Sequence, residues 1–363
     1  MIPIAKPFLD EKEINAVADV LKSGMLAQGK KVKEFEEKFA EYIGVKYAIS
    51  TNNGTTALHT SLLSAGIGKD DEIITTPFSF IASSNSILYT GAKPVFVDIR
   101  EDDFNINPDL IEEKITSKTK GILIVHLYGQ PCDMKKIMKI CNDNDLILIE
   151  DACQAHGAEY DNKRVGSFGT GCFSFYPTKN MTTGEGGMIT TNDEKIAETM
   201  KLMRDHGAKQ MYYHEILGYN YRMTDIGAAI GLEQLKKLDK FNEKRIENAN
   251  YLTENLKDIK GLITPETFSE RKHVFHQYTI KITEEFSLSR EEFIKKLEDN
   301  GIGTRIYYPL PVHKQKLYKD MGYNEKMPVS ERMADEVLSL PIYPSLTEKD
   351  LNKIIDNIKC LAR

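Results

Sequence analysis

Lys179 is the residue of this sequence whose setting first suggests chemistry. It lies in the stretch SFYPTKNMTTGEGG (174–187), where an apolar, strand-like run delivers a lysine into a turn ahead of a glycine-rich loop. An amine held out of water can condense with a carbonyl group to form a Schiff base. The alternative is that Lys179 simply reaches solvent, as most lysines do. The residues delivered by the neighbouring strands decide between these two interpretations.

Two further apolar runs end in residues that could bind the same ligand. The run KYAIST leads into NNGTTAL, where Gly54, Thr55 and Thr56 open a predicted helix. The free amides of such a helix suit an anion such as phosphate, although an ordinary capped helix has the same pattern. The run DEIITTP delivers Phe80, which could cover a flat ring or simply fill the core.

The run LILIEDACQ delivers two adjacent acids, Glu150 and Asp151, and then Gln154. Because side chains alternate along a strand, only one of the two acids can face a ligand at the strand end. A carboxylate at that position is costly unless it is paired, and a cationic ring nitrogen is a suitable partner. A helix cap or an ordinary ion pair is an equally good reading of the acid in isolation. The strand before Lys179 adds a hydroxyl group, Ser174.

Together these residues match one cofactor, pyridoxal 5'-phosphate (PLP). PLP carries a phosphate, a pyridinium whose N–H needs an acid, a phenolic oxygen and an aldehyde that condenses with lysine. Each feature is a weak signal alone, whereas the combination in this order is a strong one. The sequence therefore predicts a PLP enzyme in which Lys179 and Asp151 are the catalytic residues.

An alternation of short apolar runs and helical segments must position these residues. Most of the runs are separated by amphipathic helices, two of which are expected to end at Gly24 and Gly44. This pattern predicts an α/β fold with a mostly parallel sheet covered on both faces, in which ligands bind at the carboxyl ends of the strands. The predicted strands lie in KYAIST, DEIITTP, KPVFVDI, GILIVHLYG, LILIEDA, GCFSFYP and GMITTN.

The pattern changes after the long helical stretch that begins at TDIGAAIG and is expected to form one or two helices. The rest of the chain mixes isolated strands with helices, which predicts a smaller α+β domain. We therefore predict a large cofactor-binding domain with an N-terminal arm in residues 1–244 and a small C-terminal domain in residues 245–363. The expected strands there are HQYTIKI and GTRIYYP, and the expected helices are SREEFIKKLEDNG, SERMADEVLSL and TEKDLNKIIDNIKCLA.

The composition excludes several other classes of protein. The chain has 363 residues, of which 41 % are hydrophobic and 28 % charged, as in a soluble globular protein. A net charge of -6 without a basic stripe argues against a nucleic-acid partner. No apolar run approaches the roughly 20 residues that span a bilayer, and no secretory signal is visible, so we expect a cytoplasmic protein without a membrane partner. The spacing of the five cysteines and eight histidines predicts neither a disulfide framework nor a metal site.

These residues also resemble a known family, the DegT/DnrJ/EryC1/StrS aminotransferases, which act mainly on nucleotide-linked keto-sugars. The resemblance covers nearly the whole chain. It implies the fold type I architecture of PLP-dependent transferases, with a large domain built on a mostly parallel seven-stranded sheet and a small C-terminal α+β domain. It also implies a homodimer with active sites built across the interface. Beyond the runs quoted above, it rests on HLYGQPCDM, RDHG, GYNYRMTDIGAAIG, YYPLPVHKQ and LSLPIYP.

The resemblance implies a role for each candidate site residue. Lys179 falls on the Schiff-base lysine, Asp151 on the partner of the pyridine nitrogen, and Gln154 on the residue that faces the ring hydroxyl. The remaining positions are the phosphate site at Gly54, Thr55, Thr56 and Ser174, the ring-stacking Phe80, Asn220 reaching the phosphate of the neighbouring subunit, and the substrate-bordering Tyr308 and His313.

The activity implied is the transfer of an amino group from an amino acid, with glutamate as the expected donor, to a nucleotide-linked keto-sugar. The product would be an amino sugar for polysaccharide, glycan or secondary-metabolite synthesis. Some relatives are dehydratases with histidine in place of the lysine, so Lys179 favours transamination. One alternative is another PLP enzyme on the same fold, such as an aminotransferase of a non-nucleotide carbocycle or a lyase. The other alternative is a non-catalytic regulatory protein on the same fold. Arg305 could bind the donor carboxylate or form a surface ion pair.

Overall fold

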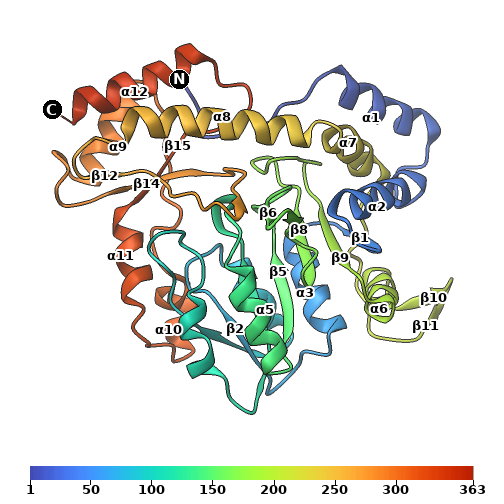
Figure 1. Ribbon diagram of the computed structural model, residues 1–363. Helices are drawn as coiled ribbons and strands as arrows, with labels where there is room; N and C mark the ends of the chain where they lie inside the picture. The colour runs from blue at the N-terminus through green and yellow to red at the C-terminus, as the bar shows by residue number, and fades with distance from the viewer. Residues whose placement is uncertain (363) are drawn as a thin grey trace.

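A seven-stranded sheet forms the centre of the molecule, as described by the computed structural model for residues 1–362 (Figure 1). The strand order is β1-β9-β8-β5-β4-β2-β3. Strand β9 runs antiparallel to both of its neighbours, and the other neighbouring strands are parallel. The strands are β1 (Tyr47–Thr51), β2 (Glu72–Thr75), β3 (Lys93–Phe96), β4 (Thr119–Val125), β5 (Ile147–Asp151), β8 (Thr170–Ser174) and β9 (Gly187–Thr191).

All seven apolar runs form strands of this sheet, as the sequence predicts. Successive residues of a strand enter hydrophobic clusters on opposite faces, as Ile73 and Ile74 do in β2 and Leu123 and Ile124 do in β4. Burial on both faces explains why the strands read as continuous apolar runs rather than as alternating ones.

Helices cover both faces of the sheet. Helices α3, α4 and α6 pack on one face, whereas α2, α7 and α5 pack on the other. The helices of this part of the chain are α1 (Glu11–Ser23), α2 (Lys30–Ile43), α3 (Gly54–Ser64), α4 (Ala82–Tyr89), α5 (Met134–Asp143), α6 (Glu194–Arg204) and α7 (Asp225–Leu235).

The first two helices end where the sequence predicts. Gly24 and Gly44 are the C-caps of α1 and α2, with φ values of 71° and 83°. This left-handed conformation strains residues that carry a Cβ atom, so glycine is the natural residue at both positions.

The C-terminal residues form a second hydrophobic core. This core joins α8 (Leu238–Leu256), α9 (Arg290–Asp299) and α12 (Glu348–Leu361) with a three-stranded antiparallel sheet, and Ile2 from the N-terminus packs into it. Helix α8 runs without a break through the expected boundary at residues 244 and 245, and it crosses the top of Figure 1 as one yellow rod. The division of the chain into residues 1–244 and 245–363 therefore stays a prediction. The small sheet contains β12 (Leu262–Ile263), β14 (Tyr278–Ile282) and β15 (Val337–Leu340).

Part of the C-terminal region leaves this core and packs on the edge of the large sheet. Helix α10 (Lys316–Asp320) packs beside β3 and α4, and α11 (Pro328–Glu336) packs against the hydrophobic cluster on one face of the large sheet. The Tyr323 hydroxyl donates to the Pro94 carbonyl at 2.9 Å, and the Ser330 amide donates to the Asp98 carboxylate at 2.9 Å. The N-terminal and C-terminal parts of the chain thus contact each other in both hydrophobic cores.

Two expectations for this region are wrong. The run GTRIYYP forms no strand, because Arg305 pairs with Ser339 in a single β-bridge and the chain then turns toward the large sheet. The run SERMADEVLSL is helical only as far as Glu336, because its last residues pair with β14 as strand β15. The helices expected in SREEFIKKLEDNG and TEKDLNKIIDNIKCLA are confirmed as α9 and α12, and the long helical stretch forms two helices, α7 and α8.

The remaining elements are short. None of the helices in residues 1–362 is both long enough and apolar enough to cross a membrane. The short strands are β6 (Glu159–Tyr160), β7 (Lys163–Arg164), β10 (Ala208–Gln210), β11 (Tyr213–His214) and β13 (Arg271–Lys272), and the 3-10 turns are η1 (Pro108–Leu110), η2 (Glu112–Lys114), η3 (Leu127–Gly129) and η4 (Val312–Lys314).

Candidate active site

The predicted site residues meet where β5 and β8 end and α3 begins. Gly54 opens α3 directly against Ser174, the last residue of β8. A Cβ atom at Gly54 would lie 2.7 Å from the Cβ of Ser174 and 3.1 Å from the Sγ of Cys153. Only glycine therefore lets the N-terminus of α3 approach the end of β8 this closely.

The N-terminus of α3 has the properties of an anion site. Asn53 caps the helix, because its Oδ1 accepts from the amide of Thr56 at 2.9 Å. The amides of Gly54 and Thr55 have no acceptor within residues 1–362, and the Ser174 hydroxyl donates to no group there. Free amides at the positive end of a helix, with a hydroxyl beside them, fit the phosphate of PLP.

Asp151 ends β5 on the side of this cradle. Its side chain is buried, with Oδ2 accepting from the Ser83 hydroxyl at 2.7 Å and Oδ1 from the Cys153 amide at 3.1 Å. It forms no ion pair with a protein cation within residues 1–362. A buried carboxylate of this kind fits the N–H of a pyridinium ring, which supplies the missing positive charge.

Glu150 turns to the opposite face of the sheet, as the alternation of side chains predicts. It accepts from the ring Nε2 of His126 at 3.1 Å and from the amides of Gly166, Phe168 and Gly169, each at 2.8 Å. Burial acts to raise the pKa of Glu150, but these hydrogen bonds and the charge of His126 lower the pKa below its ordinary value. Glu150 therefore stabilises the fold behind the site rather than facing a ligand.

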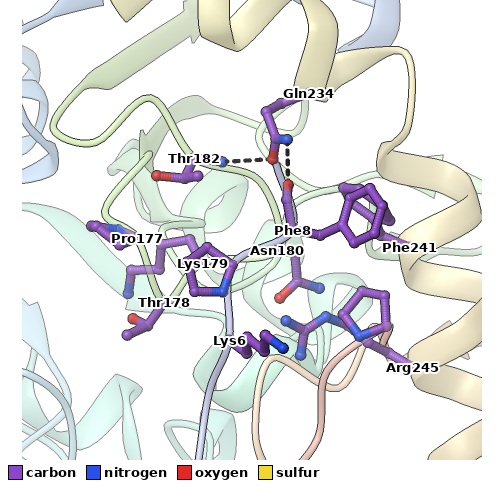
Figure 2. A pocket seen from close by; sticks show the side chains of 12 residues that line it. Lys6, Phe8, Pro177, Thr178, Lys179, Asn180, Thr182, Gln234, Phe241 and Arg245 are labelled. Carbon is purple, nitrogen blue, oxygen red and sulfur yellow. Dashed lines mark hydrogen bonds between the residues drawn. The ribbon is translucent and has the colours of Figure 1, made fainter. Parts of the chain in front are cut away.

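Lys179 lies in the loop after β8 and is partly buried. Its backbone amide donates to the Tyr176 carbonyl at 2.9 Å, and its side chain forms no ion pair in the described part of the chain. Burial lowers the pKa of Lys179, although the nearby Cys153 and Asp151 act in the opposite direction. The neutral, nucleophilic amine is thereby favoured. In Figure 2 this amine points away from Lys6 and Arg245.

Gln154 and Tyr308, both predicted site residues, contact each other. The Nε2 of Gln154 lies 3.2 Å from the hydroxyl of Tyr308, and its Oε1 accepts from the amide of Tyr128 at 3.0 Å. Because the carbonyl end of the amide is already engaged, the NH2 end must face the site. Burial raises the pKa of Tyr308, so its hydroxyl stays protonated and can also donate.

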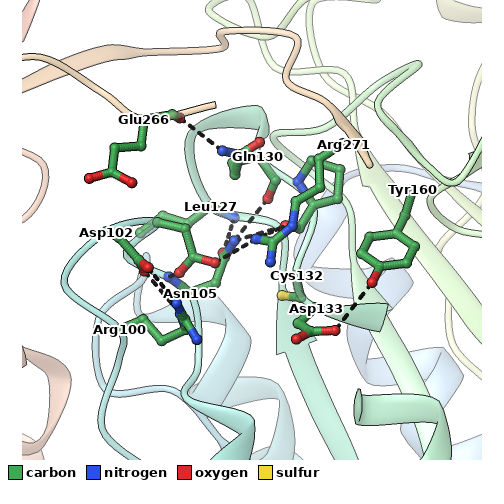
Figure 3. Close-up of polar contacts among 12 residues, drawn as sticks. Arg100, Asp102, Asn105, Leu127, Gln130, Cys132, Asp133, Tyr160, Glu266 and Arg271 are labelled. Atoms are coloured by element: carbon green, nitrogen blue, oxygen red, sulfur yellow. Dashed lines mark hydrogen bonds and ion pairs between the residues drawn. The ribbon is translucent and has the colours of Figure 1, made fainter. Parts of the chain in front are cut away.

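A buried polar network holds the turn η3, which carries Tyr128 (Figure 3). The Oδ1 of Asn105 accepts from the amide of Leu127 at 2.9 Å, and its Nδ2 donates to the Gln130 carbonyl at 3.0 Å. Arg271 pairs with the buried Asp103 at 2.6 Å and donates to the Pro131 carbonyl at 3.1 Å. This network fixes the turn, and through the turn it fixes the orientation of the Gln154 amide.

The other predicted residues lie less centrally. Phe80 follows β2 and is 59 % exposed, and Asn220 is exposed beside Asp205. His313 is fully buried next to Phe96, with its Nε2 3.2 Å from the Glu331 carboxylate. Their roles in ring stacking, phosphate binding and substrate contact stay predictions. Arg305 is exposed and forms no ion pair within residues 1–362.

The sequence reasoning missed Ser83, Tyr128 and Cys153. Ser83 lies in the first turn of α4, only one turn beyond Phe80, and it supplies the hydroxyl that reaches Asp151. Extending the search from strand ends into the first turn of each following helix would have found it. Tyr128 acts through its backbone amide, which no residue pattern reveals.

Comparison with known proteins agrees with this geometry. Residues 7–359 match the model of the DegT/DnrJ/EryC1/StrS aminotransferase family. Among curated proteins, the chain is 44 % identical to a pleiotropic regulatory protein of Geobacillus stearothermophilus (95 % of this chain, 93 % of that protein). It is 40 % identical to GDP-perosamine synthase of Caulobacter vibrioides (98 % and 96 %). It is 41 % identical to dTDP-3-amino-3,6-dideoxy-alpha-D-galactopyranose transaminase of Aneurinibacillus thermoaerophilus (97 % and 98 %).

Solved structures show the same fold. DesV of S. venezuelae, crystallised in complex with a ketimine intermediate, superimposes with a TM-score of 0.94 at 36 % identity over 99 % of both chains. NtdA of Bacillus subtilis, with bound cofactor PMP, gives a TM-score of 0.91 at 34 % identity over 97 % of this chain and 81 % of that chain. The predicted fold type I architecture is thereby confirmed. The chain belongs to the DegT/DnrJ/EryC1/StrS aminotransferase family.

Proposed function

We propose that this protein is a PLP-dependent aminotransferase that moves an amino group from glutamate to a nucleotide-linked keto-sugar. The observation that carries the proposal is the meeting of an anion cradle, a buried unpaired carboxylate and a lysine of lowered pKa at one edge of the sheet. Two relatives bear names with a GDP-linked and a dTDP-linked sugar, which supports a nucleotide-sugar substrate for this chain.

When bound, PLP supplies a ring that accepts the electron pair left when a C–H bond next to the amino nitrogen breaks. Lys179 Nζ would be the covalent anchor of the cofactor, and as a free amine it would act as the general base and acid that moves the proton. Asp151 would keep the ring nitrogen protonated, and the NH2 group of Gln154 would donate to the ring oxygen. Ser174 and the amides of α3 hold the phosphate.

An absorbance spectrum of the purified protein tests this assignment. PLP bound through Lys179 should give a visible band that fades when glutamate is added and returns when an accepted keto-sugar is supplied. Lys179→Ala should lose the band and lower turnover by at least about 10²-fold, because proton transfer by a positioned side chain contributes that much or more. A band that is unchanged by every amino donor would favour the regulatory protein suggested by one relative's name.

We also propose that the active protein is a homodimer with sites built across the interface. Large apolar side chains lie exposed on two parts of the surface, the β10–β11 hairpin and the region of α1. Exposed apolar side chains that gather in one region indicate a surface that another chain covers. The residues are Met211, Tyr212, Tyr213 and Leu217 in the hairpin region, and Ile14, Leu21, Met25 and Leu26 in the region of α1.

Mixed dimers test whether Asn220 acts in the neighbouring subunit. Lys179→Ala and Asn220→Ala should each be weakly active alone. If Asn220 serves the partner's site, a mixed dimer contains one site with both residues intact, and random mixing restores about a quarter of wild-type activity. No recovery on mixing, with dimers present by light scattering, would place Asn220 outside the partner's site.

A cytoplasmic location is part of the same proposal. The structure leaves all five cysteines as free thiols, and three of them are buried. Free thiols persist in reducing compartments.

A further inference from the structure

A small cavity lies behind the Lys179 loop, on the side away from the amine (Figure 2). It is enclosed by the N-terminal segment, the loop that carries Lys179, the helices α7 and α8, and Pro344. No acidic residue lines it, and its polar lining residues are Lys6, Thr178, Lys179, Asn180, Thr182, Gln234 and Arg245. The cavity is thus a pocket with cations on its wall and no carboxylate.

Arg245 is the most unusual of these residues. Its side chain is only 4 % exposed, and its Nη1 donates to the carbonyls of Phe275 and Ile342 at 3.1 and 2.8 Å. Its Nε has no partner, and it forms no ion pair within residues 1–362. Burial lowers the pKa of Arg245 to about 9, so the guanidinium is still charged at neutral pH. A buried cation without a counter-ion is costly, because it has lost its water and gained no opposite charge.

Other groups make this region still more positive. Lys6 lines the same cavity and also has no ion pair in the described part of the chain. The buried rings of His156 and His276 have lowered pKa values, first because of burial and then because of the charges of Lys179 and Arg245. These histidines carry no charge of their own when neutral. Their lowered pKa values show that adding another positive charge in this region is unfavourable.

We propose that the cavity binds a chloride ion between Lys6 and Arg245. The free space beside these two cations is small, about that of a single small particle. The unpartnered Oδ1 of Asn180 would accept from a water molecule, which makes water the competing occupant. The buried Arg245, which has no counter-ion, and the exposed Lys6 beside it favour the anion over water. Lys179 also lines the cavity, so the ion would lie beside the loop of the proposed active site, but its binding does not depend on the proposed activity.

Crystals of the full PLP-loaded chain grown in sodium bromide test the occupant directly. We expect an anomalous bromide peak in the cavity, next to Lys6 Nζ and the Arg245 guanidinium. An ordinary water peak there, without anomalous signal, would overturn the proposal.

Thermal unfolding in solution provides the second test. At constant ionic strength, replacing gluconate by chloride should raise the unfolding midpoint of the PLP-loaded protein and then saturate, because an ion bound only to the folded state stabilises it. Lys6→Gln should lose most of this increase, whereas Lys12→Gln, which removes an exposed lysine outside the cavity, should keep it.

Arg245→Gln should also lose the chloride effect, and Lys6→Gln decides the matter if the buried variant fails to fold. Equal midpoints in chloride and gluconate for the wild-type protein would contradict the proposal. A bromide peak without any effect in solution would mean binding at crystal concentration only, and would also count against it.

Discussion

Asp151 shows how much of the site depends on one hydrogen bond. The carboxylate is buried at the end of β5, and the hydroxyl of Ser83 is its only side-chain donor among residues 1–362. Hydrogen bonds to charged groups contribute more than neutral ones, because the charge keeps part of the stabilisation that water would have given. Ser83 therefore holds the Asp151 carboxyl group in one orientation before the cofactor binds.

Replacing Ser83 by alanine should lower the free energy of unfolding of the cofactor-free protein by about 2 kcal/mol, since a buried charge loses a donor. Urea denaturation measures this change. Ser84→Ala is the matched control, because the Ser84 hydroxyl makes a long hydrogen bond of 3.3 Å to the Ile81 carbonyl and should cost much less. Equal losses for the two variants would show that Ser83 does not support Asp151.

Lys179 should make the cofactor-free protein less stable at neutral pH. Its pKa is lowered in the folded state, so the unfolded chain binds more protons between the folded pKa and the ordinary lysine pKa. Stability should therefore rise with pH through that window. Lys179→Met should raise the urea midpoint at neutral pH, and the difference from wild type should shrink as pH rises toward the ordinary lysine pKa. Lys12→Met, an exposed lysine, should show no such trend.

At the scale of elements, the strand ends were more predictable than the loops between them. The seven apolar runs and the rule that ligands bind at carboxyl ends placed Asp151, Ser174 and Gly54 together, and the structure confirms that arrangement. The strand β15 could not be read from SERMADEVLSL, because only its pairing with the distant β14 makes that segment extended. Long-range pairing of this kind leaves no local signal in the sequence.

The contact between α3 and β8 gives a prediction at this scale. Gly54→Ala introduces a Cβ atom 2.7 Å from that of Ser174, so the helix must move away from the strand. We expect a loss of about 1–3 kcal/mol in stability and at least about tenfold weaker PLP binding, measured by urea denaturation and by cofactor titration.

Gly68→Ala is the control for this contact, because a Cβ atom there meets nothing within 4 Å. Adding Ser174→Gly to Gly54→Ala removes the clashing atom and should recover part of the stability without recovering phosphate binding. Full PLP affinity in Gly54→Ala would show that the phosphate does not use this helix end.

In the whole molecule, each of the two hydrophobic cores includes a segment from the other end of the chain. Ile2 packs among C-terminal residues, and α10 and α11 pack on the large sheet. The boundary expected near residue 244 was based on a change in the pattern of predicted helices and strands. That pattern depends on local composition and does not show against which partner a segment packs. The packing of Ile2 in the C-terminal core and of α10 and α11 on the large sheet could therefore not be predicted from one sequence.

We expect the chain to unfold as one cooperative unit. Urea denaturation followed by far-ultraviolet circular dichroism and by tyrosine fluorescence should give coincident transitions. A fragment of residues 1–244 should fail to fold, because it exposes the apolar surface of the large sheet that α10 and α11 cover. Two separate transitions, or a folded fragment, would show that the two cores are independent.

Helix α8 restricts movement of the two hydrophobic cores relative to each other. It is continuous from the large layer into the C-terminal core, where Arg245 and Asn248 bond the carbonyls of Ile342 and Tyr343. A hinge between the two cores would have to bend this rod or break those bonds. The continuous helix and these bonds therefore oppose closure of one core on the other.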